Sequence, residues 1–571
     1  MISVMAFVAG AALVYGGVAS RAGWQLGTGK GFGSARWLGL GQAGRAGLFG
    51  RKGVPIGDWG RSSFTARSAA DGHILTVAPP GGGKSSTGSI PSGLSDGIHS
   101  RFITDPDGEI SAVCIDYWRR RTDAHFIINP FGMWSEDPWH LPQHSFDPIA
   151  FIKPEHDGGK FARLMAATLI AQGAHDDGST EYFKSQGAEK LEAYLIFGAL
   201  RGLTLPEIGD LMGLPLEPVG TSDGLSCQFD IWEAMETIDA LDGLLRREAI
   251  DLKDKLKNSP GEFQAIFSTM KDAVKFLKEP AIRRALAKNE VDWAALKTKR
   301  AVVSVVMPSR DWQLYAGFVK LAFACVIKAL DDGAIARHHV HILLEEFPSL
   351  GRLPFFGDLL ATGRKKKAKI EIVIQNIGQL RAIYPEWRAL IPNFEVRRFK
   401  AVRDGETAQF VSTLMGRKTE QYRKALFARE LLTPDEVATI PRDRQIVFIG
   451  NLRPALMGQY PYWQKAILKA RALPNPFYAL TPETGAMALL RKLHALLLRT
   501  GEWIVRPSPY VVLLGCALML WGAKPSVLID ESVGKRGRIE SCTWLTRKGI
   551  VTQASRYGQC ARVTVFDQVL A

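Results

Sequence analysis

Short runs of apolar and β-branched residues alternate with longer helical stretches through most of the chain. Several of the runs are almost entirely apolar, as expected for strands that are buried on both faces of a parallel sheet. The alternation predicts a three-layer α/β fold. The predicted strands are His73–Val77, Arg101–Thr104, His125–Ile128, Val302–Val306, Val340–Leu344, Glu371–Ile374, Val396–Ala401 and Gln445–Ile449.

One long interval, residues 180–299, has little strand character and carries abundant Lys and Glu at helical spacing. We interpret it as a mainly helical insertion that divides the sheet domain into a first part, residues 66–179, and a second part, residues 300–475. The preceding residues 21–65 are rich in glycine, which predicts an irregular connector.

The chain begins with an uncharged apolar run, residues 1–20, close to the length of about 20 residues that a membrane-spanning helix needs. No Lys or Arg precedes the run, which favours an anchor over the alternatives of a signal peptide or a buried helix. The charges that follow are all basic up to Asp58, so the positive-inside rule places the next segment in the cytoplasm.

A second apolar run, residues 509–523, is short for a membrane span, and a buried core helix is the alternative. An amphipathic connector with basic residues, 476–508, precedes it. If both runs span, the β-rich tail at residues 524–571 is periplasmic. An oxidising compartment would allow Cys542 and Cys560 to form a disulfide, and the alternative is a cytosolic hairpin with two free thiols.

The charge of the chain narrows the set of partners. The 571 residues carry a net charge of +15 with a pI near 9.5, which favours nucleic acid or an anionic membrane surface. A solvated basic surface is the alternative. The six cysteines show no CxxC spacing, which argues against a zinc site.

The stretch Ala78–Ser85, "APPGGGKS", follows a predicted strand and fits the phosphate-loop pattern, with Ala in the first glycine position. Glycines let the backbone wrap closely, so that successive N–H groups point into one concavity. Lys84 would reach the outer phosphates, and the Ser85 hydroxyl would bind Mg²⁺. A flexible turn is the alternative. The predicted nucleotide-binding residues are Pro80, Gly81, Gly82, Gly83, Lys84, Ser85 and Ser86.

Two carboxylates, Glu345 and Glu346, end the apolar strand in "HVHILLEEF". This is the layout of the acidic motif that accompanies a phosphate loop. In that motif the first acid holds the metal and the second polarises the attacking water. We assign these roles to Glu345 and Glu346. The usual first acid is Asp, so the extra methylene of Glu345 predicts a shifted metal-bound water or slower hydrolysis.

A further predicted strand ends at Gln375, whose side chain would sense the γ-phosphate or orient water. The basic run before that strand includes Arg364, a candidate arginine finger for the site of a neighbouring subunit. A solvated loop is the alternative for this run.

Together these blocks resemble the TraG/TraD-like coupling proteins of type IV secretion and conjugation, which are membrane-bound RecA-like ATPases. The resemblance covers about residues 33–463. Its blocks stand in the order of the family: "GSARW", "APPGGGKSS", "ITDPDGEI", "INPFG", "SFDPI", "LLEEFPSLGRLPFF", "IVIQNIGQL", "ETAQFVSTLMG" and "LLTPDEVATIP".

The resemblance implies a RecA-like P-loop NTPase fold, ATP and Mg²⁺ as cofactors, and a homo-hexamer at the bacterial inner membrane. It also implies ATP-powered delivery of a DNA–relaxase complex, or of effector proteins, to a type IV secretion channel. The helical insertion would contact the relaxase or single-stranded DNA, the DNA without sequence preference. The alternatives are a septal or chromosomal DNA pump and a nucleotide-binding receptor with little hydrolysis.

Three features depart from the family pattern. Glu345 replaces Asp, and Asp107 replaces the usual Lys, which puts basic contacts to the nucleotide there in doubt. The family commonly has two N-terminal spans, whereas this chain is predicted to have one near each end. The tail at residues 524–571 would then take the place of the outward-facing domain.

Overall fold

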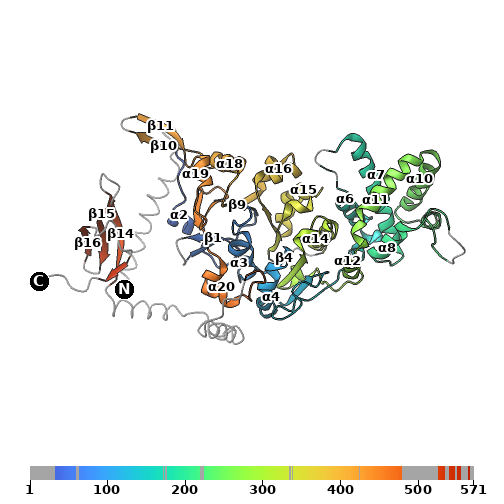
Figure 1. The fold of residues 1–571 in the computed structure, drawn as a ribbon, viewed down its shortest axis with the longest axis horizontal. Coiled ribbons are helices and arrows are strands. Elements are labelled where there is room, and N and C mark those ends of the chain that lie inside the picture. The colour runs from blue at the N-terminus through green and yellow to red at the C-terminus, as the bar shows by residue number, and fades with distance from the viewer. Residues whose placement is uncertain are drawn as a thin grey trace, which may run out of the picture. The chain divides into compact units, whose positions relative to one another are not determined.

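An eleven-stranded mixed sheet organises the chain up to residue 478 in the computed structural model (Figure 1). The structure describes residues 33–59, 64–171, 173, 176–218, 224–333, 336, 338–422, 425–478 and, by backbone alone, 525–533, 539–546, 549–554 and 563–565. The predicted spans at residues 1–20 and 509–523 lie outside this set. Among the helices that are described, none has the length and hydropathy needed to cross a bilayer.

The strands of the sheet are β1 (Val54–Trp59), β2 (Phe64–Ser68), β3 (His73–Val77), β4 (Ser100–Pro106), β5 (Ala124–Ile128), β6 (Ala301–Met307), β7 (Val340–Leu344), β8 (Ala368–Ile374), β9 (Phe394–Lys400), β12 (Arg444–Ile449) and β13 (Ala455–Gly458). They lie in the order β2-β1-β13-β12-β9-β3-β8-β7-β4-β6-β5. The strands from β9 to β5 are parallel, and the other four extend the sheet in antiparallel pairs.

All eight predicted strands are present, but two expectations were wrong. Strand β12, expected in the parallel sheet, runs antiparallel to both β9 and β13, and the short link at residues 450–454 permits only the antiparallel pairing with β13. The glycine-rich residues 21–65 are not wholly irregular, since they contain α2 (Leu40–Arg45) and β1. Leu48 and Ile56 are buried with Val447 in one apolar cluster, which orders this segment despite its glycines.

Helices cover both faces of the sheet, which gives the predicted three layers. Adjacent strand residues point to opposite faces: Phe102 and Val303 belong to one apolar cluster, Ile103 and Val302 to the other. On one face lie η1 (Ser85–Ser89), α3 (Ile90–Gly93), α4 (Glu109–Arg121) and α20 (Ala466–Arg471). On the other lie α6 (Lys160–Leu169), α14 (Ala316–Asp331), α15 (Phe356–Thr362), α16 (Ile377–Ile383) and α18 (Gly405–Met415).

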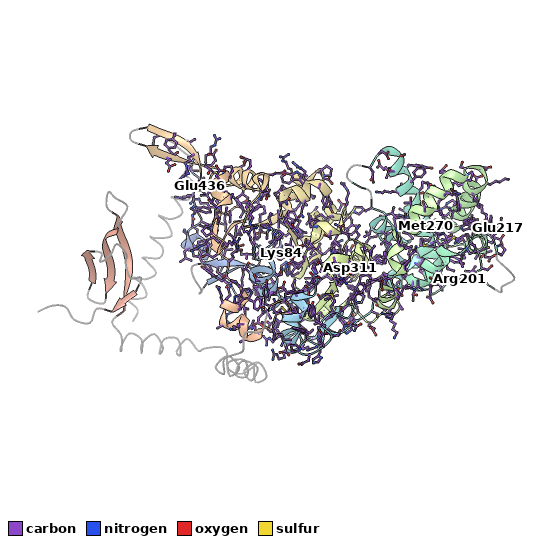
Figure 2. All side chains as sticks on the ribbon, in the orientation of Figure 1. Lys84, Arg201, Glu217, Met270, Asp311 and Glu436 are labelled. Atoms are coloured by element: carbon purple, nitrogen blue, oxygen red, sulfur yellow. The ribbon has the colours of Figure 1, made fainter. Side chains whose placement is uncertain are left out.

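The interval between β5 and β6 holds a group of helices and, among its described residues, no strand. The α-helices that follow α6 in this interval are α7 (Gly178–Leu200), α8 (Leu205–Gly213), α9 (Gln228–Glu236), α10 (Leu244–Asn258), α11 (Pro260–Ala273), α12 (Pro280–Ala285) and α13 (Ala295–Thr298). Tyr194, Trp232 and Met270 are buried at its centre. Figure 2 labels Met270, Arg201 and Glu217 in this helical group and Lys84 among the strands of the sheet.

The C-terminal tail forms its own antiparallel sheet in the order β16-β15-β14-β17. Its strands are β14 (Pro525–Val533), β15 (Ile539–Thr546), β16 (Gly549–Ala554) and β17 (Val563–Val565), which confirms the β-rich character predicted for residues 524–571. Cys542 lies on β15, but Cys560 lies outside the described residues, so the disulfide stays a prediction.

A buried polar network crosses four neighbouring parallel strands. Arg398 of β9 pairs with Glu371 of β8 and donates to Thr76 Oγ1 of β3 at 2.7 Å. Thr76 donates to Glu371 at 2.9 Å, and His341 Nε2 of β7 lies 3.0 Å from the other Glu371 oxygen. The Arg398 and Glu371 side chains are both only 2% exposed. Each charge therefore depends on the other for its stability in the interior.

We expect Arg398→Met to lower the free energy of unfolding by about 3 kcal/mol, because it leaves the Glu371 charge buried without its cation. Chemical denaturation of the full-length protein measures this. The matched control is Arg283→Met, which breaks the exposed pair with Asp210 and should cost less than about 1 kcal/mol. Equal losses in the two variants would contradict the buried pair's role.

The same network predicts acid sensitivity. Burial by itself raises the pKa of Glu371, but Arg398 and the hydrogen bonds from His341 and Thr76 outweigh burial and lower that pKa from 4.5 to about 2. A depressed carboxyl pKa stabilises the fold above pH 4.5, and this contribution is lost as the pH falls toward 2. Thermal unfolding at decreasing pH should therefore show the loss. In Arg398→Met the acid-induced loss should be smaller, because the cation that outweighs burial is gone and the pKa of Glu371 rises toward or above its unfolded value. An identical pH profile in both proteins would refute the assignment.

Candidate functional site

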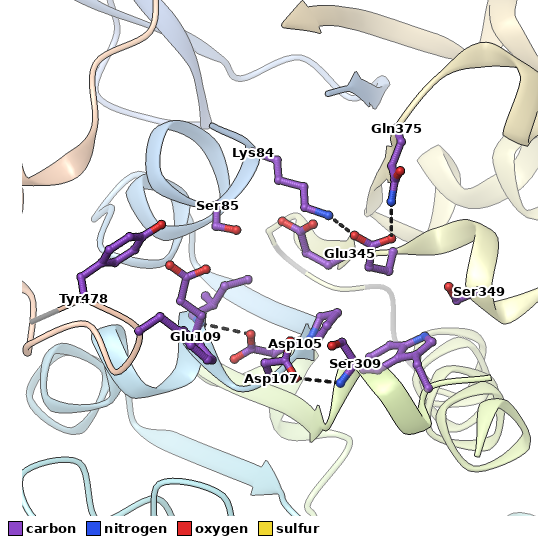
Figure 3. Close-up of a pocket in the computed structure, with 15 residues that line it drawn as sticks. Lys84, Ser85, Asp105, Asp107, Glu109, Ser309, Glu345, Ser349, Gln375 and Tyr478 are labelled. Atoms are coloured by element: carbon purple, nitrogen blue, oxygen red, sulfur yellow. Dashed lines mark hydrogen bonds and ion pairs between the residues drawn. The ribbon is translucent and has the colours of Figure 1, made fainter. Parts of the chain in front are cut away.

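Four parallel strands bring their carboxyl ends to one edge of the sheet. β3 leads into the phosphate loop, β7 into Glu345 and Glu346, and β8 into Gln375, while Asp105 lies near the end of β4. A pocket of about 400 Å³ opens at this edge (Figure 3). It is lined by Lys84, Ser85, Asp105, Pro106, Asp107, Glu109, Ile110, Ser309, Trp312, Glu345, Glu346, Ser349, Gln375, Phe477 and Tyr478.

The loop between β3 and η1 has the backbone that a phosphate loop requires. Gly83 has φ +80°, a left-handed value that disfavours side chains. A Cβ at Gly82 would come within 2.8 Å of the Pro79 carbonyl oxygen. The helix begins at Ser85, so the amides of Ser85 and Ser86 have no acceptor within the helix and are available to an anion. It ends at Gly93, soon after Pro91.

Two residues that were not predicted from the sequence, Thr87 and Lys400, stabilise this loop through hydrogen bonds. Thr87 donates from its amide and its hydroxyl to the Gly83 carbonyl, at 3.0 and 2.6 Å. Lys400, fully buried at the end of β9, donates to Thr87 Oγ1 at 2.7 Å. Burial lowers the pKa of Lys400 well below its usual value. The sequence signal for this contact was a lysine near the end of the predicted strand Val396–Ala401.

The predicted catalytic groups of β7 and β8 converge with the phosphate-loop lysine. Lys84 Nζ forms an ion pair with Glu346 Oε1, and Gln375 Nε2 donates to Glu346 Oε2 at 3.4 Å. Figure 3 shows Lys84 and Gln375 approaching one carboxylate from two sides. Glu346 has left-handed backbone angles, φ 48° and ψ 41°, at the turn that follows β7. Both partners of the pair remain 23% exposed, so an incoming anion can reach them.

Glu345, the predicted metal-holding acid, lies deeper than Glu346 and is only 3% exposed. Ser89, one helical turn after Ser85, donates a hydrogen bond to Glu345 Oε1. Burial raises the pKa of Glu345, and the charge of Lys84 opposes this shift. The longer acid is thus anchored to the phosphate-loop helix, with its carboxylate still on the wall of the pocket.

The tip of β4 adds two carboxyl groups. Asp105 is buried and accepts hydrogen bonds from the amides of Ile110 and Ser111, at 3.1 and 2.6 Å, yet burial raises its pKa to about 7. Asp107, which stands where Lys was expected, accepts from the Ser309 amide at 2.7 Å. The sequence motif "DPD" placed Asp105 and Asp107 near the nucleotide, but Asp105 was not among the predicted site residues, although an acid at the end of an apolar strand was the same signal that identified Glu345.

The pocket lining is strongly acidic, with five carboxyl groups against one Lys. Across the described ranges, however, no group of three or more His, Cys, Asp or Glu side chains is arranged to hold a metal ion by itself. A Mg²⁺ ion fits this site only together with phosphate oxygens, which is how Mg²⁺ commonly binds in nucleotide sites. Ser85 and Glu345 are the residues that could complete its coordination.

Arg364 lies away from this pocket. It belongs to η6 (Gly363–Lys366), which precedes β8, whereas Gln375 follows β8. The seven residues of β8 span about 23 Å between these ends. Arg364 is exposed and does not serve the pocket of its own subunit, so its role in a neighbouring subunit stays a prediction.

Comparison with known proteins gives a family for this arrangement. The family model described as Type IV secretory system Conjugative DNA transfer matches residues 36–484. Protein VirD4 of Agrobacterium fabrum (strain C58 / ATCC 33970) is 25% identical over 485 residues, covering 78% of this chain and 68% of that protein. Conjugal transfer protein TraG of Escherichia coli is 25% identical over 527 residues, covering 78% of this chain and 79% of that protein.

Solved structures show a similar fold. The conjugative coupling protein TrwBdeltaN70, in complex with sulphate, aligns with a TM-score of 0.57 at 18% identity, over 76% of this chain and 96% of that chain. TrwB in complex with ADP and Mg²⁺ aligns with a TM-score of 0.56 at 17% identity, over 76% of this chain and 97% of that chain. The phosphate loop, the acidic strand end and the matched family model agree: the chain belongs to the type IV secretory system conjugative DNA transfer family.

Proposed function

We propose that this chain is a coupling protein that binds Mg²⁺–ATP in the pocket and hydrolyses it to power transfer of a DNA–relaxase complex, or of effector proteins, through a type IV secretion channel. The observation that carries the proposal is the convergence of Lys84 and Gln375 on Glu346 beside the phosphate loop. The solved coupling protein TrwB, described in complexes with ADP and Mg²⁺ and with the non-hydrolysable ATP analogue ADPNP, supports this choice of ligand.

The roles of the residues follow from their positions. Lys84 binds the outer phosphates, and Gln375 senses the γ-phosphate. Mg²⁺, held by the Ser85 hydroxyl and by Glu345, would neutralise phosphate charge. A phosphate that enters the pocket competes with Glu346 for Lys84, because both are anions. Binding therefore frees the Glu346 carboxylate to polarise the attacking water.

The acidity of the pocket supports assembly into a ring. A triphosphate would add further negative charge beside five carboxyl groups and a single Lys. Mg²⁺ offsets part of this charge, and a cation from an adjacent subunit would offset more. We assign that cation to a neighbouring copy in a homo-hexamer, with Arg364 as the candidate finger.

The net charges of the helical insertion and of the second part of the motor domain have opposite signs, which favours different partners for the two. Residues 180–299 contain 20 acidic and 16 basic residues, whereas residues 300–475 contain 28 basic and 16 acidic residues. Several insertion lysines are already paired, among them Lys190 with Glu248 and Lys255 with Glu262. The helical insertion is thus suited to a relaxase or effector protein, and the second motor segment to sequence-independent, salt-sensitive contacts with single-stranded DNA.

The apolar runs at residues 1–20 and 509–523 and their basic flanks support a bacterial inner-membrane location. In this arrangement the motor domain is cytoplasmic and the tail at residues 524–571 is periplasmic. A nucleotide-binding receptor with little hydrolysis is the second candidate. The substitution of Glu345 for Asp and its buried contact with Ser89 favour that alternative.

Lys84→Ala should abolish ATP turnover and weaken Mg²⁺–ATP binding, because the mutant lacks the cation that meets the outer phosphates. The measurement is phosphate release by the purified full-length protein with ATP, Mg²⁺ and single-stranded DNA. The control is Lys278→Ala, an exposed lysine of the helical insertion, which should retain the wild-type rate. A wild-type rate no higher than that of Lys84→Ala would select the receptor over the motor.

Glu346→Gln should lower turnover by about 100-fold or more while preserving nucleotide binding, because the amide keeps the shape of the side chain but cannot take up a proton. Steady-state kinetics and titration with ADPNP separate the two effects. Glu189→Gln, on the exposed face of α7, is the matched control. Turnover close to wild type in Glu346→Gln would remove this residue from the mechanism.

A further inference from the structure

Two aromatic side chains line the nucleotide pocket without a role in the phosphate chemistry. Phe477 and Tyr478 are 51% and 62% exposed, although both are large and one is wholly apolar. In Figure 3 the Tyr478 side chain points from its loop toward the side of the pocket that holds Ser85 and Glu109. Exposed aromatic surface beside a ligand pocket indicates that a flat, apolar part of a ligand binds there.

The segment that carries these residues is held firmly against the sheet domain. The Leu473 amide donates to the Val113 carbonyl of α4 at 2.9 Å, and the Trp139 indole donates to the Pro474 carbonyl at 2.8 Å. Asn475 Nδ2 donates to Glu109 Oε1, at the start of α4, at 2.7 Å. The segment is therefore tied to the same helix whose first turn borders the pocket.

A local turn then presents the two rings. The amide of Phe477 donates to the Asn475 side chain at 2.9 Å, and the amide of Tyr478 donates to the Asn475 carbonyl at 3.3 Å. Trp134 packs edge-on against Phe477, with ring centroids 5.5 Å apart, and its indole donates to the Asp107 carbonyl at 2.7 Å. The backbone of the aromatic pair is thus fixed before any ligand arrives.

We propose that Phe477 and Tyr478 form an aromatic clamp on which the base of the nucleotide stacks. This inference rests on the proposed nucleotide-binding function and names the part of the ligand that the phosphate residues leave unbound. In the proposed binding mode Lys84 and Gln375 contact the phosphate groups, so the base of the nucleotide must contact another part of the pocket. The aromatic pair offers the flat apolar surface that a base needs, and stacking of this kind tolerates any base.

The test compares a ligand that has a base with one that has none. Calorimetric titration of the full-length protein with ADPNP and with inorganic tripolyphosphate, both with Mg²⁺, gives the two affinities. We expect Phe477→Ala and Tyr478→Ala each to weaken ADPNP binding about tenfold, within the range for loss of one stacking contact. The affinity for tripolyphosphate should not change, because it has no base to stack.

Two controls distinguish stacking from damage to the loop. Tyr478→Phe keeps the ring and should bind ADPNP like the wild type. Ile467→Ala removes an exposed apolar side chain of α20 outside the pocket and should change neither affinity. Unchanged ADPNP affinity in both alanine variants, or equal weakening of both ligands, would overturn the clamp. Wild-type protein that binds neither ligand would instead refute the proposed nucleotide site, and the clamp with it.

Discussion

Parallel pairing of β3, β8, β7 and β4 is the constraint on which the site depends. Parallel strands end at the same edge of a sheet, so four segments that are distant in sequence deliver Lys84, Gln375, Glu346 and Asp105 to one pocket. Side chains alternate along a strand, so a slip of one residue in β7 would exchange the positions of Glu345 and Glu346 relative to the phosphate loop. Register in this sheet is therefore a functional property.

The buried network of Arg398, Thr76, Glu371 and His341 is suited to maintain that register. Each member lies on a different strand of the parallel set, and each polar contact is satisfied only when the strands are aligned. Well-packed apolar residues often stabilise a core as much as a buried ion pair does, so specificity is the better explanation for the network. Lys400, on the same strand as Arg398, extends this support to the phosphate loop through its contact with Thr87.

The sequence by itself determined the elements and the chemistry that depend on local pattern. Short runs rich in apolar and β-branched residues identified the eight predicted strands of the sheet domain, and several of these runs are almost entirely apolar because burial on both faces favours such sequence. The glycine-rich loop with Lys84 was recognisable because its backbone needs those glycines. The acids after β7 and the glutamine after β8 were recognisable because each directly follows an apolar strand.

Only the tertiary structure decided which distant residues share the pocket. Asp105, Lys400 and Tyr478 belong to the site or its support through strand order and loop path, which the local sequence pattern does not specify. The fold likewise separated Arg364 from its own pocket, because that residue precedes the strand that Gln375 follows. Local pattern specifies what a segment forms, whereas the pairing of strands specifies what it meets, and pairing is a property of the whole chain.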